Sequence, residues 1–290
     1  MEPQPNYYKR RIAAIFVFAV VLLFIGRHLT FLPKIELTKS ENEKLKNGTQ
    51  NIIKDKPGFY SVYYKDFITQ DSFGIDEHQI ETGASVNKVP IIAVLYYLAN
   101  KGEIKLDDRI SVQKDDIQDY GTGSIRYQKL PATYSYRNLA KLALQQSDNT
   151  AAHVISLKLG PDKIQKLVSS WGMKQTIMAA NKTTAYDMSI VYEKIYKNEI
   201  TDSANTKELL EFMTDTDIED RLPKDLPKNI KVYHKSGDGE GFVHDVGIIG
   251  TTEEGAYYLG IMTSDIGNNE QKTKDTIAQI SKKIFDTINF

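Results

Sequence analysis

Cysteine is absent from all 290 residues of this sequence. Its absence excludes a thiol nucleophile, cysteine-ligated zinc and disulfide bonds, and it leaves the compartment open because an exported bacterial protein can also lack disulfides. An excess of charge of one sign is missing as well, since 37 Lys and Arg residues stand against 38 Asp and Glu. With a net charge of −1 there is no sign of the basic face that nucleic-acid binding normally needs, so no such partner is expected.

Metal and phosphate motifs are lacking too. The five histidines show no ligand spacing such as H-E-x-x-H. The glycine-rich segments at 121–123 and 237–241 do not match a phosphate loop and are typical of turns. We therefore expect no metal and no cofactor. Tyr120, directly before the first of these segments, is expected either to line a cleft as an aromatic wall or to pack in the interior.

An uninterrupted apolar run at 12–26 follows a basic cluster at 9–11 and precedes Arg27 and His28. The run is shorter than the ~20 residues of a full membrane span, so it fits a secretory signal or a short anchor. No small-x-small cleavage site follows it, which favours an uncleaved anchor. The basic cluster predicts a cytoplasmic tip and an exported body. We expect residues 1–33 to form this tip and a single-pass cell-membrane anchor, or else a signal sequence.

The body begins after a charged segment at 34–57, which is expected to be a stalk that passes into a first helix. Aromatic and β-branched residues at 58–67 predict a strand, and residues 73–82 are expected to be its hairpin partner. Three more strand-like runs separated by turn residues follow near the end of the chain, at 230–237, 242–250 and 256–265.

The middle of the body is mostly helical by its apolar spacing. Helices are predicted at 89–99, 136–147, 149–160 and 162–172. In the tail at 274–290, one helical face carries isoleucines that would pack on the sheet, namely Ile277, Ile280, Ile284 and Ile288.

These patterns predict an α+β fold with an antiparallel sheet of about five strands flanked by helices and an inserted all-helical lobe. A chain of this length can bury a sizeable core. We expect the sheet lobe to combine 58–84 with 225–290, and the helical lobe to span 85–224, within one domain at 58–290.

Three short motifs are candidates for chemistry, and each is weak alone. Ser-x-x-Lys occurs at Ser85 with Lys88 and again at Ser111 with Lys114. Ser-x-Asn occurs at Ser40, Ser85, Ser147 and Ser203, whereas Lys-Ser-Gly occurs once, at 235–237. Taken singly, these motifs favour a capped helix, a loop and a strand that ends in a turn.

Their order and setting change this interpretation. Ser85 follows the predicted strand pair and opens an apolar helix, and Lys88 lies one turn further on the same face. Ser147 and Asn149 lie between two helices, and the Lys-Ser-Gly motif lies on a late strand. This arrangement resembles the class A serine β-lactamases and the penicillin-binding proteins related to them, over roughly residues 50–290. The Ser111 copy fits poorly because no apolar helix follows it.

The chemistry of a serine nucleophile explains the residue types. Ser85 needs a base to remove its proton, and Lys88 can serve only when its amine is neutral. Burial and a neighbouring cation such as Lys235 would favour the neutral amine.

The resemblance adds further roles. It implies an oxyanion hole made by the backbone N–H groups of Ser85 and Asp238. It also implies that Ser147 passes a proton to the leaving nitrogen, and that Asn149 holds Lys88 and the substrate amide. By the same resemblance, Lys235 and Ser236 bind the substrate carboxylate. Gly237 would let the strand approach the substrate closely, and Asp148 is expected to be a structural loop residue.

The pattern departs from the family in one place. Class A β-lactamases carry a loop whose glutamate activates the deacylating water, yet no glutamate occurs between Glu103 and Glu193, and the segment before residue 183 is short. We therefore expect that loop to be deleted. Asp187 and Asp162 are the nearest acidic candidates, although a helix cap or a surface charge is the better interpretation of both.

The late strands also lack the arginine that many family members place after the Lys-Ser-Gly motif. His244 lies there instead. We expect His244 to be a hydrogen-bonded surface histidine rather than a substrate ligand.

The resulting hypothesis is a membrane-anchored, extracytoplasmic serine hydrolase, expected to be monomeric, that forms an acyl-enzyme with β-lactams. A D-alanyl-D-alanine-type cell-wall peptidase is the alternative within the same chemistry. A weakly catalytic protein that binds or senses cell-wall peptides is the alternative outside it.

Overall fold

The computed structural model describes residues 41–251 and 255–288. The chain divides into two units, Met1–Lys44 and Leu45–Phe290, and of the first unit only the helical residues 41–44 are described. The anchor predicted at 1–33 lies outside the described residues. Within the described ranges, no helix is both long enough and apolar enough to span a bilayer.

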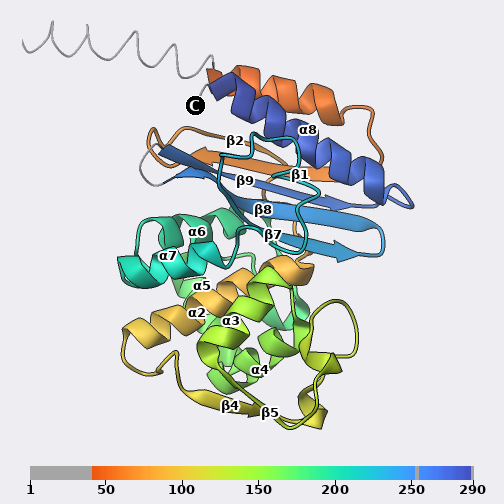
Figure 1. Ribbon diagram of the computed structural model, residues 1–290. Coiled ribbons are helices and arrows are strands. Elements are labelled where there is room, and N and C mark those ends of the chain that lie inside the picture. The colour runs from red at the N-terminus through yellow and green to blue at the C-terminus, as the bar shows by residue number, and fades with distance from the viewer. Residues whose placement is uncertain (1–40, 252–254, 289–290) are drawn as a thin grey trace, which may run out of the picture. The chain divides into compact units, whose positions relative to one another are not determined.

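Five antiparallel strands form the central sheet, in the order β2-β1-β9-β8-β7 (Figure 1). Their bounds are β1 (Phe59–Asp66), β2 (Ser72–Ile75), β7 (Val232–Gly239), β8 (Phe242–Thr251) and β9 (Gly255–Ser264). Strand β1 pairs along its whole length with β9, so the two ends of the body meet in the middle of the sheet. The prediction of a five-stranded sheet built from two distant segments is confirmed.

Two short ladders lie outside the main sheet. They are β3 (Glu81–Thr82) with β6 (Lys182–Thr183), and β4 (Arg109–Val112) with β5 (Ala132–Ser135). The expectation that 73–82 as a whole is the partner of the first strand is therefore wrong in its second half. The chain leaves the sheet after Ile75 because Asp76 has a left-handed backbone (φ +48°).

Helices surround the sheet on both faces. The α-helices are α2 (Lys88–Asn100), α3 (Tyr136–Gln145), α4 (Asn149–Leu159), α5 (Pro161–Trp171), α6 (Ala185–Tyr196), α7 (Ser203–Glu211) and α8 (Glu270–Ile288). The 3-10 turns are η1 (Ala84–Asn87), η2 (Lys114–Asp116), η3 (Ile125–Tyr127) and η4 (Met178–Ala180). Residues 41–53 are also helical, as predicted for the end of the stalk. Figure 1 shows α8 on one side of the sheet and α2 to α7 on the other.

The alternation of strand side chains divides the core in two. On β9, Tyr258 belongs to the core shared with α2 and α6, whereas Tyr257 belongs to the core under α8. The predicted apolar face of the tail helix is confirmed, because Ile277, Ile280 and Ile284 are fully buried there. Burial of each such side chain contributes about 1.5–3 kcal/mol.

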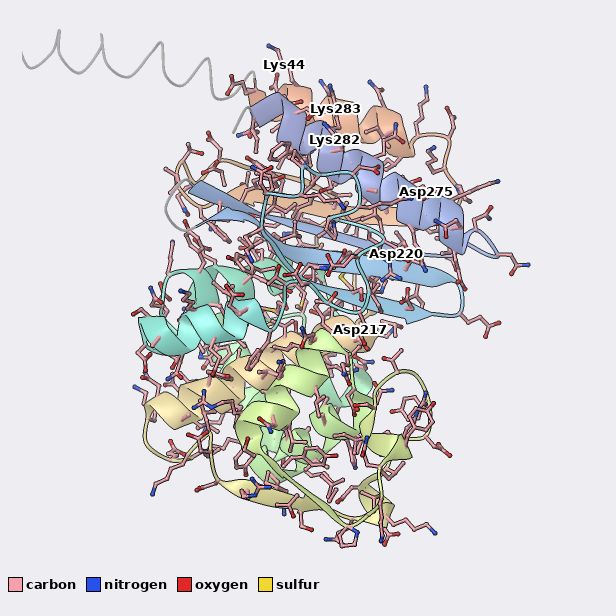
Figure 2. The ribbon with its side chains drawn as sticks, viewed as in Figure 1. Lys44, Asp217, Asp220, Asp275, Lys282 and Lys283 are labelled. Carbon is pink, nitrogen blue, oxygen red and sulfur yellow. The ribbon has the colours of Figure 1, made fainter. Side chains whose placement is uncertain are left out.

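The segment between α7 and β7 is fixed against α8. Lys224 pairs with Asp275 at 2.6 Å, and Lys274 pairs with Asp220 at 3.0 Å. Figure 2 labels Asp220 and Asp275 on the two sides of this contact. The contact holds the segment where Arg221 can reach the sheet.

Candidate active site

Ser85 lies in the 3-10 turn η1, between β3 and α2. Its Oγ lies 3.0 Å from Nζ of Lys88, the first residue of α2. Ala84, directly before the serine, has φ +46°, a left-handed conformation that costs a non-glycine residue about 1–2 kcal/mol. The N-cap of α2 is Asn87, so Ser85 precedes the helix but does not cap it.

Lys88 is buried, with 7% of its surface exposed. Its Nζ donates to Ser147 O at 2.5 Å and to Asn149 Oδ1 at 2.6 Å, and it lies 3.0 Å from Ser147 Oγ. Burial and, second, the positive charge of Lys235 lower the pKa of Lys88 to about 6. The amine is thus mostly neutral at pH 7 and lies between two serine hydroxyls, as the sequence argument required.

Ser147, Asp148 and Asn149 form the corner between α3 and α4. Ser147 has φ +55°, and Asp148 accepts from Ala151 N as the N-cap of α4 and from Ile125 N. The expectation that Asp148 is a structural residue is confirmed. Asn149 contacts Lys88 through Oδ1 and donates through Nδ2 to Tyr120 O at 2.8 Å.

Strand β7 carries the Lys-Ser-Gly motif beside the turn of Ser85. Lys235 is buried, and burial lowers its pKa to about 8. A Cβ at Gly237 would lie 3.2 Å from Gly83 O and 3.3 Å from Ser85 N. A larger residue at this position would push the serine turn away by a few tenths of an ångström, because the strand approaches its backbone so closely.

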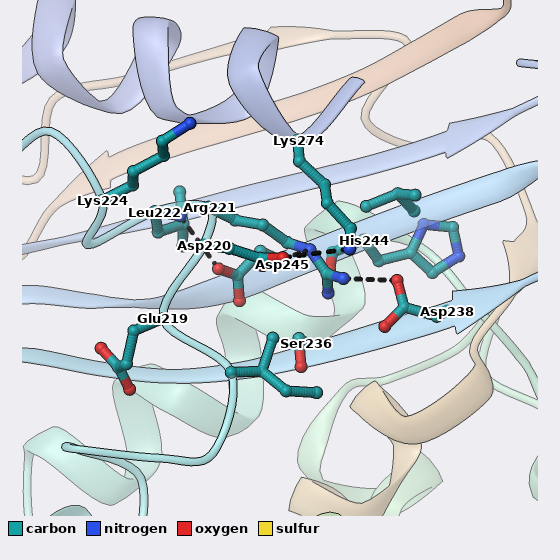
Figure 3. Close-up of polar contacts among 12 residues, drawn as sticks. Glu219, Asp220, Arg221, Leu222, Lys224, Ser236, Asp238, His244, Asp245 and Lys274 are labelled. Atoms are coloured by element: carbon teal, nitrogen blue, oxygen red, sulfur yellow. Dashed lines mark hydrogen bonds and ion pairs between the residues drawn. The ribbon is translucent and has the colours of Figure 1, made fainter. Parts of the chain in front are cut away.

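Arg221 is a functional residue that was not predicted from the sequence. It comes from the segment before β7 and is 1% exposed. Its Nη2 donates to Asp238 Oδ1 at 2.5 Å and its Nη1 donates to His244 O at 3.2 Å (Figure 3). An arginine was sought only on the strands after Lys235. No local sequence pattern marks Arg221, because its position depends on how the segment before β7 packs against α8.

His244 is not the surface histidine that was expected, because only 1% of it is exposed. Its Nδ1 accepts from Thr263 N at 3.0 Å, which leaves Nε2 to donate to Thr82 O at 2.8 Å. Burial lowers its pKa to about 4. His244 therefore joins β8 to β3 as a neutral ring.

His234, directly before Lys235 on β7, is a buried charged residue. His234 Nδ1 contacts Asp245 Oδ1 at 2.8 Å, and its Nε2 contacts Glu219 at 3.2 Å. Burial opposes a charge on the ring, but the negative charge of Asp245 and the hydrogen bonds to Asp245 and Glu219 raise the pKa of His234 to about 9. The ring is therefore a cation held between two carboxylates.

The serine turn η1, the start of α2, the corner between α3 and α4, and strand β7 contribute to the walls of a cleft of about 700 Å³. Six of the eight residues predicted for the site line it, namely Ser85, Lys88, Ser147, Asn149, Ser236 and Asp238. Lys235 and Gly237 do not line it and are buried in β7. Tyr120 also lines the cleft and is 65% exposed, so the alternative of interior packing is wrong.

The acidic candidates lie away from this cleft. Asp187 is buried and accepts from Gln175 N and Thr176 Oγ1, each at 2.8 Å, so it is not a surface charge. Asp162 lies in the first turn of α5 and does not line the cleft. Asp238, paired with Arg221, is the one carboxylate among the described residues that line the cleft.

Comparison with known proteins agrees with this geometry. A β-lactamase of Moraxella catarrhalis, BRO-1, is 21% identical over 300 aligned positions that cover 92% of this chain and 95% of that protein. The solved structure of PBP-A has a TM-score of 0.78 and 24% identity, and the match covers 84% of this chain and 96% of that one. A β-lactamase structure from Chitinophaga pinensis has a TM-score of 0.80 and 19% identity, and the match covers 85% of this chain and 100% of that one.

The structural likenesses, all below 25% identity, establish the fold. The family match extends further, because residues 44–288 match the family described as the Beta-lactamase enzyme family. This chain therefore belongs to the β-lactamase enzyme family, as a serine β-lactamase-like hydrolase.

Proposed function

We propose that this protein is acylated at Ser85 by β-lactams and that it works outside the cytoplasm from a membrane anchor at residues 1–33. The observation that carries the acylation is the position of Lys88 Nζ, 3.0 Å from the hydroxyls of both Ser85 and Ser147. A mostly neutral amine at that point can take the proton of the Ser85 hydroxyl and, once protonated, can return a proton through the Ser147 hydroxyl.

The reaction follows from this geometry. Ser85 Oγ attacks the amide carbonyl carbon while Lys88 Nζ takes the serine proton. The backbone N–H groups of Ser85 and Asp238 stabilise the oxyanion that forms. Ser147 Oγ then passes a proton from Lys88 to the leaving nitrogen, so the C–N bond breaks and an ester to Ser85 remains.

Cations next to this reaction centre suit a substrate carboxylate. Lys235 is buried in β7. Its neighbour Ser236 lines the cleft. Arg221 is paired with Asp238, the carboxylate of the cleft, so the negative charge of Asp238 is offset. A carboxylate bound near Ser236 would thus be attracted by the charge of Lys235.

Relatives support the same chemistry. A solved structure of a PBP-A variant, with a TM-score of 0.78 and 23% identity to this chain, is an acyl-enzyme complex with penicillin G. The curated relative from Moraxella catarrhalis is a β-lactamase.

A D-alanyl peptidase, or an enzyme that keeps its acyl group for long, is the second candidate. It is favoured by the cleft itself, because the described lining residues include no glutamate. In addition, only residues 172–181 separate α5 from β6, which leaves no room for a long loop with a deacylating glutamate.

Labelling with a fluorescent penicillin tests the proposal. The full chain in detergent should become labelled, the Ser85→Ala variant should not, and the Ser111→Ala variant should label like the wild type. Ser111 is a matched control, because it carries the other Ser-x-x-Lys copy on the exposed side of β4. Failure of the wild type to label at any concentration would support a non-catalytic binding or sensing protein instead.

Turnover of a chromogenic cephalosporin then separates the two catalytic candidates. Sustained hydrolysis indicates a β-lactamase, whereas a single turnover with stable label indicates a trapped acyl-enzyme or a peptidase.

A further inference from the structure

The cleft extends beyond Ser85 along helix α4. The residues of α4 that line it are Asn149, Ala152, His153 and Ser156, which recur with the spacing of one helical face. Asn149 Oδ1 accepts from Lys88 Nζ at 2.6 Å, and His153 lies one turn further along the same face. The imidazole thus faces the cleft in the helical turn next to the residue that holds the base of Ser85.

The opposite wall of this part of the cleft is the short segment before β6. Met178, Ala179 and Asn181 line it, and Asn181 O accepts from Gly83 N at 2.7 Å, two residues before Ser85. Asn181 Oδ1 also accepts from Asn87 Nδ2 at 2.7 Å. The segment is therefore fixed directly to the serine turn.

Asn87 adds a second observation. Its side chain lines the cleft and its Oδ1 is buried, yet that atom accepts no hydrogen bond from the described residues. A buried carbonyl oxygen without a donor is unfavourable by about 1–3 kcal/mol unless water or a ligand supplies one. Asn87 Oδ1 is consequently a ready acceptor for a water molecule within this cleft.

The lysine and the carboxylate that line the cleft are engaged elsewhere. Lys88 Nζ contacts Ser147 and Asn149, and Asp238 is paired with Arg221. Among residues 41–251 and 255–288, the His153 ring makes no hydrogen bond or ion pair, unlike the rings of His78, His234 and His244. Neutral imidazole is also the side-chain base best suited to a pH near 7.

We propose that His153 is the general base of deacylation, with Asn87 Oδ1 helping to hold the attacking water. This inference rests on the proposed acylation of Ser85. A neutral ring nitrogen of His153 takes a proton from water as the water oxygen bonds to the acyl carbon. The tetrahedral intermediate then expels Ser85 Oγ, which receives the proton from the imidazolium, and the carboxylic acid product leaves with the water oxygen.

The experiment measures acylation and deacylation separately. The wild type, His153→Ala and His153→Asn are labelled with fluorescent penicillin, freed of excess reagent, and followed as the label is lost. We expect acylation rates within about two-fold of the wild type and deacylation slower by about 100-fold in both variants, a typical contribution of a general base. Added imidazole should partly restore deacylation in His153→Ala. The His78→Asn variant is the matched control, because His78 is exposed and bonds to Gln175 outside the cleft.

Each outcome decides a separate point. If a folded His153→Asn variant loses its label as fast as the wild type, the role of His153 is overturned while the acylation of Ser85 stands. The same conclusion follows if the acyl-enzyme of the wild type never hydrolyses. A wild type that takes no label overturns the proposed function, and this inference with it. Circular dichroism of each variant establishes that it is folded, and His153→Asn serves if His153→Ala does not fold.

Discussion

Lys88 keeps its amine neutral near pH 7 through burial and through the positive charge of Lys235. Because only the neutral amine accepts a proton, the acylation rate should rise with pH, reach half its maximum near pH 6 and level off above pH 7. The measurement is the rate of fluorescent penicillin labelling, at saturating reagent, between pH 5 and 8. In Lys235→Gln the repulsion between the two amines is lost, so the rise should move to higher pH. An unchanged profile in that variant would contradict this account of Lys88.

Gly237 tests the fit between β7 and the serine turn. A methyl group in Gly237→Ala meets backbone at 3.2–3.3 Å, so the turn must shift. We expect acylation to slow by about 10- to 100-fold, because the oxyanion donors on both segments move apart. Labelling kinetics of the folded variant give the measurement.

Gly48→Ala is the matched control for this substitution. Gly48 lies inside the helix at 41–53, where a Cβ meets only the Lys283 side chain at 3.5 Å. The free energy of unfolding of this variant should be about 0.5–1 kcal/mol higher than that of the wild type, and its labelling should be normal. Normal labelling of Gly237→Ala would show that the close approach does not matter.

Much of the site could be predicted at the residue scale, because its motifs are short and local. Ser85, Lys88, Ser147 and Asn149 meet as expected. Arg221 could not be predicted in the same way. Its place depends on packing between a loop and α8, which no residue spacing encodes.

At the scale of elements, His234 ties three segments together. The ring lies on β7 and contacts Asp245 of β8 and Glu219 of the segment before β7. The pKa of the ring is raised to about 9 in the folded protein. The contacts of the charged ring therefore stabilise the fold fully below pH 6.5, and this contribution is lost as the pH rises through 9.

The variant His234→Gln isolates this effect. We compare the free energy of unfolding of the wild type with that of His234→Gln. The wild type should be more stable by a margin that is about 3 kcal/mol larger at pH 6 than at pH 10, because the pKa of the ring rises from 6.5 to about 9 on folding. Urea unfolding at several pH values measures the difference. A gap that does not change with pH would mean that the ring is not charged in the folded protein.

Elements with simple periodicity were predicted well, and elements buried on several sides were not. Helix α8 shows one apolar face and lies where its isoleucines predicted. Helix α6 was not predicted individually, because it packs between the sheet and α2 and buries polar residues such as Asp187 and Ser189 with its apolar ones. Ladder β3–β6 is only two residues long on each strand, too short for any alternation to show.

At the scale of the whole molecule, the second unit, which begins at Leu45, holds both cores and the cleft. We therefore expect a shortened chain of residues 41–290 to fold cooperatively and to label with fluorescent penicillin as the full chain does. The full chain, with its apolar run at 12–26, should sediment with membranes, whereas the shortened chain should stay in the supernatant. Equal sedimentation of the two chains would contradict the proposed anchor.

The central claim is that a β-lactam forms an ester with Ser85, and mass spectrometry tests it most directly. After incubation with penicillin, the intact wild-type protein should gain the mass of one penicillin molecule, and peptide mapping should place that mass on Ser85. The Ser85→Ala variant should gain none, while Ser111→Ala should gain it as the wild type does. No added mass on the folded wild type, or an adduct that maps to another residue, would contradict the account.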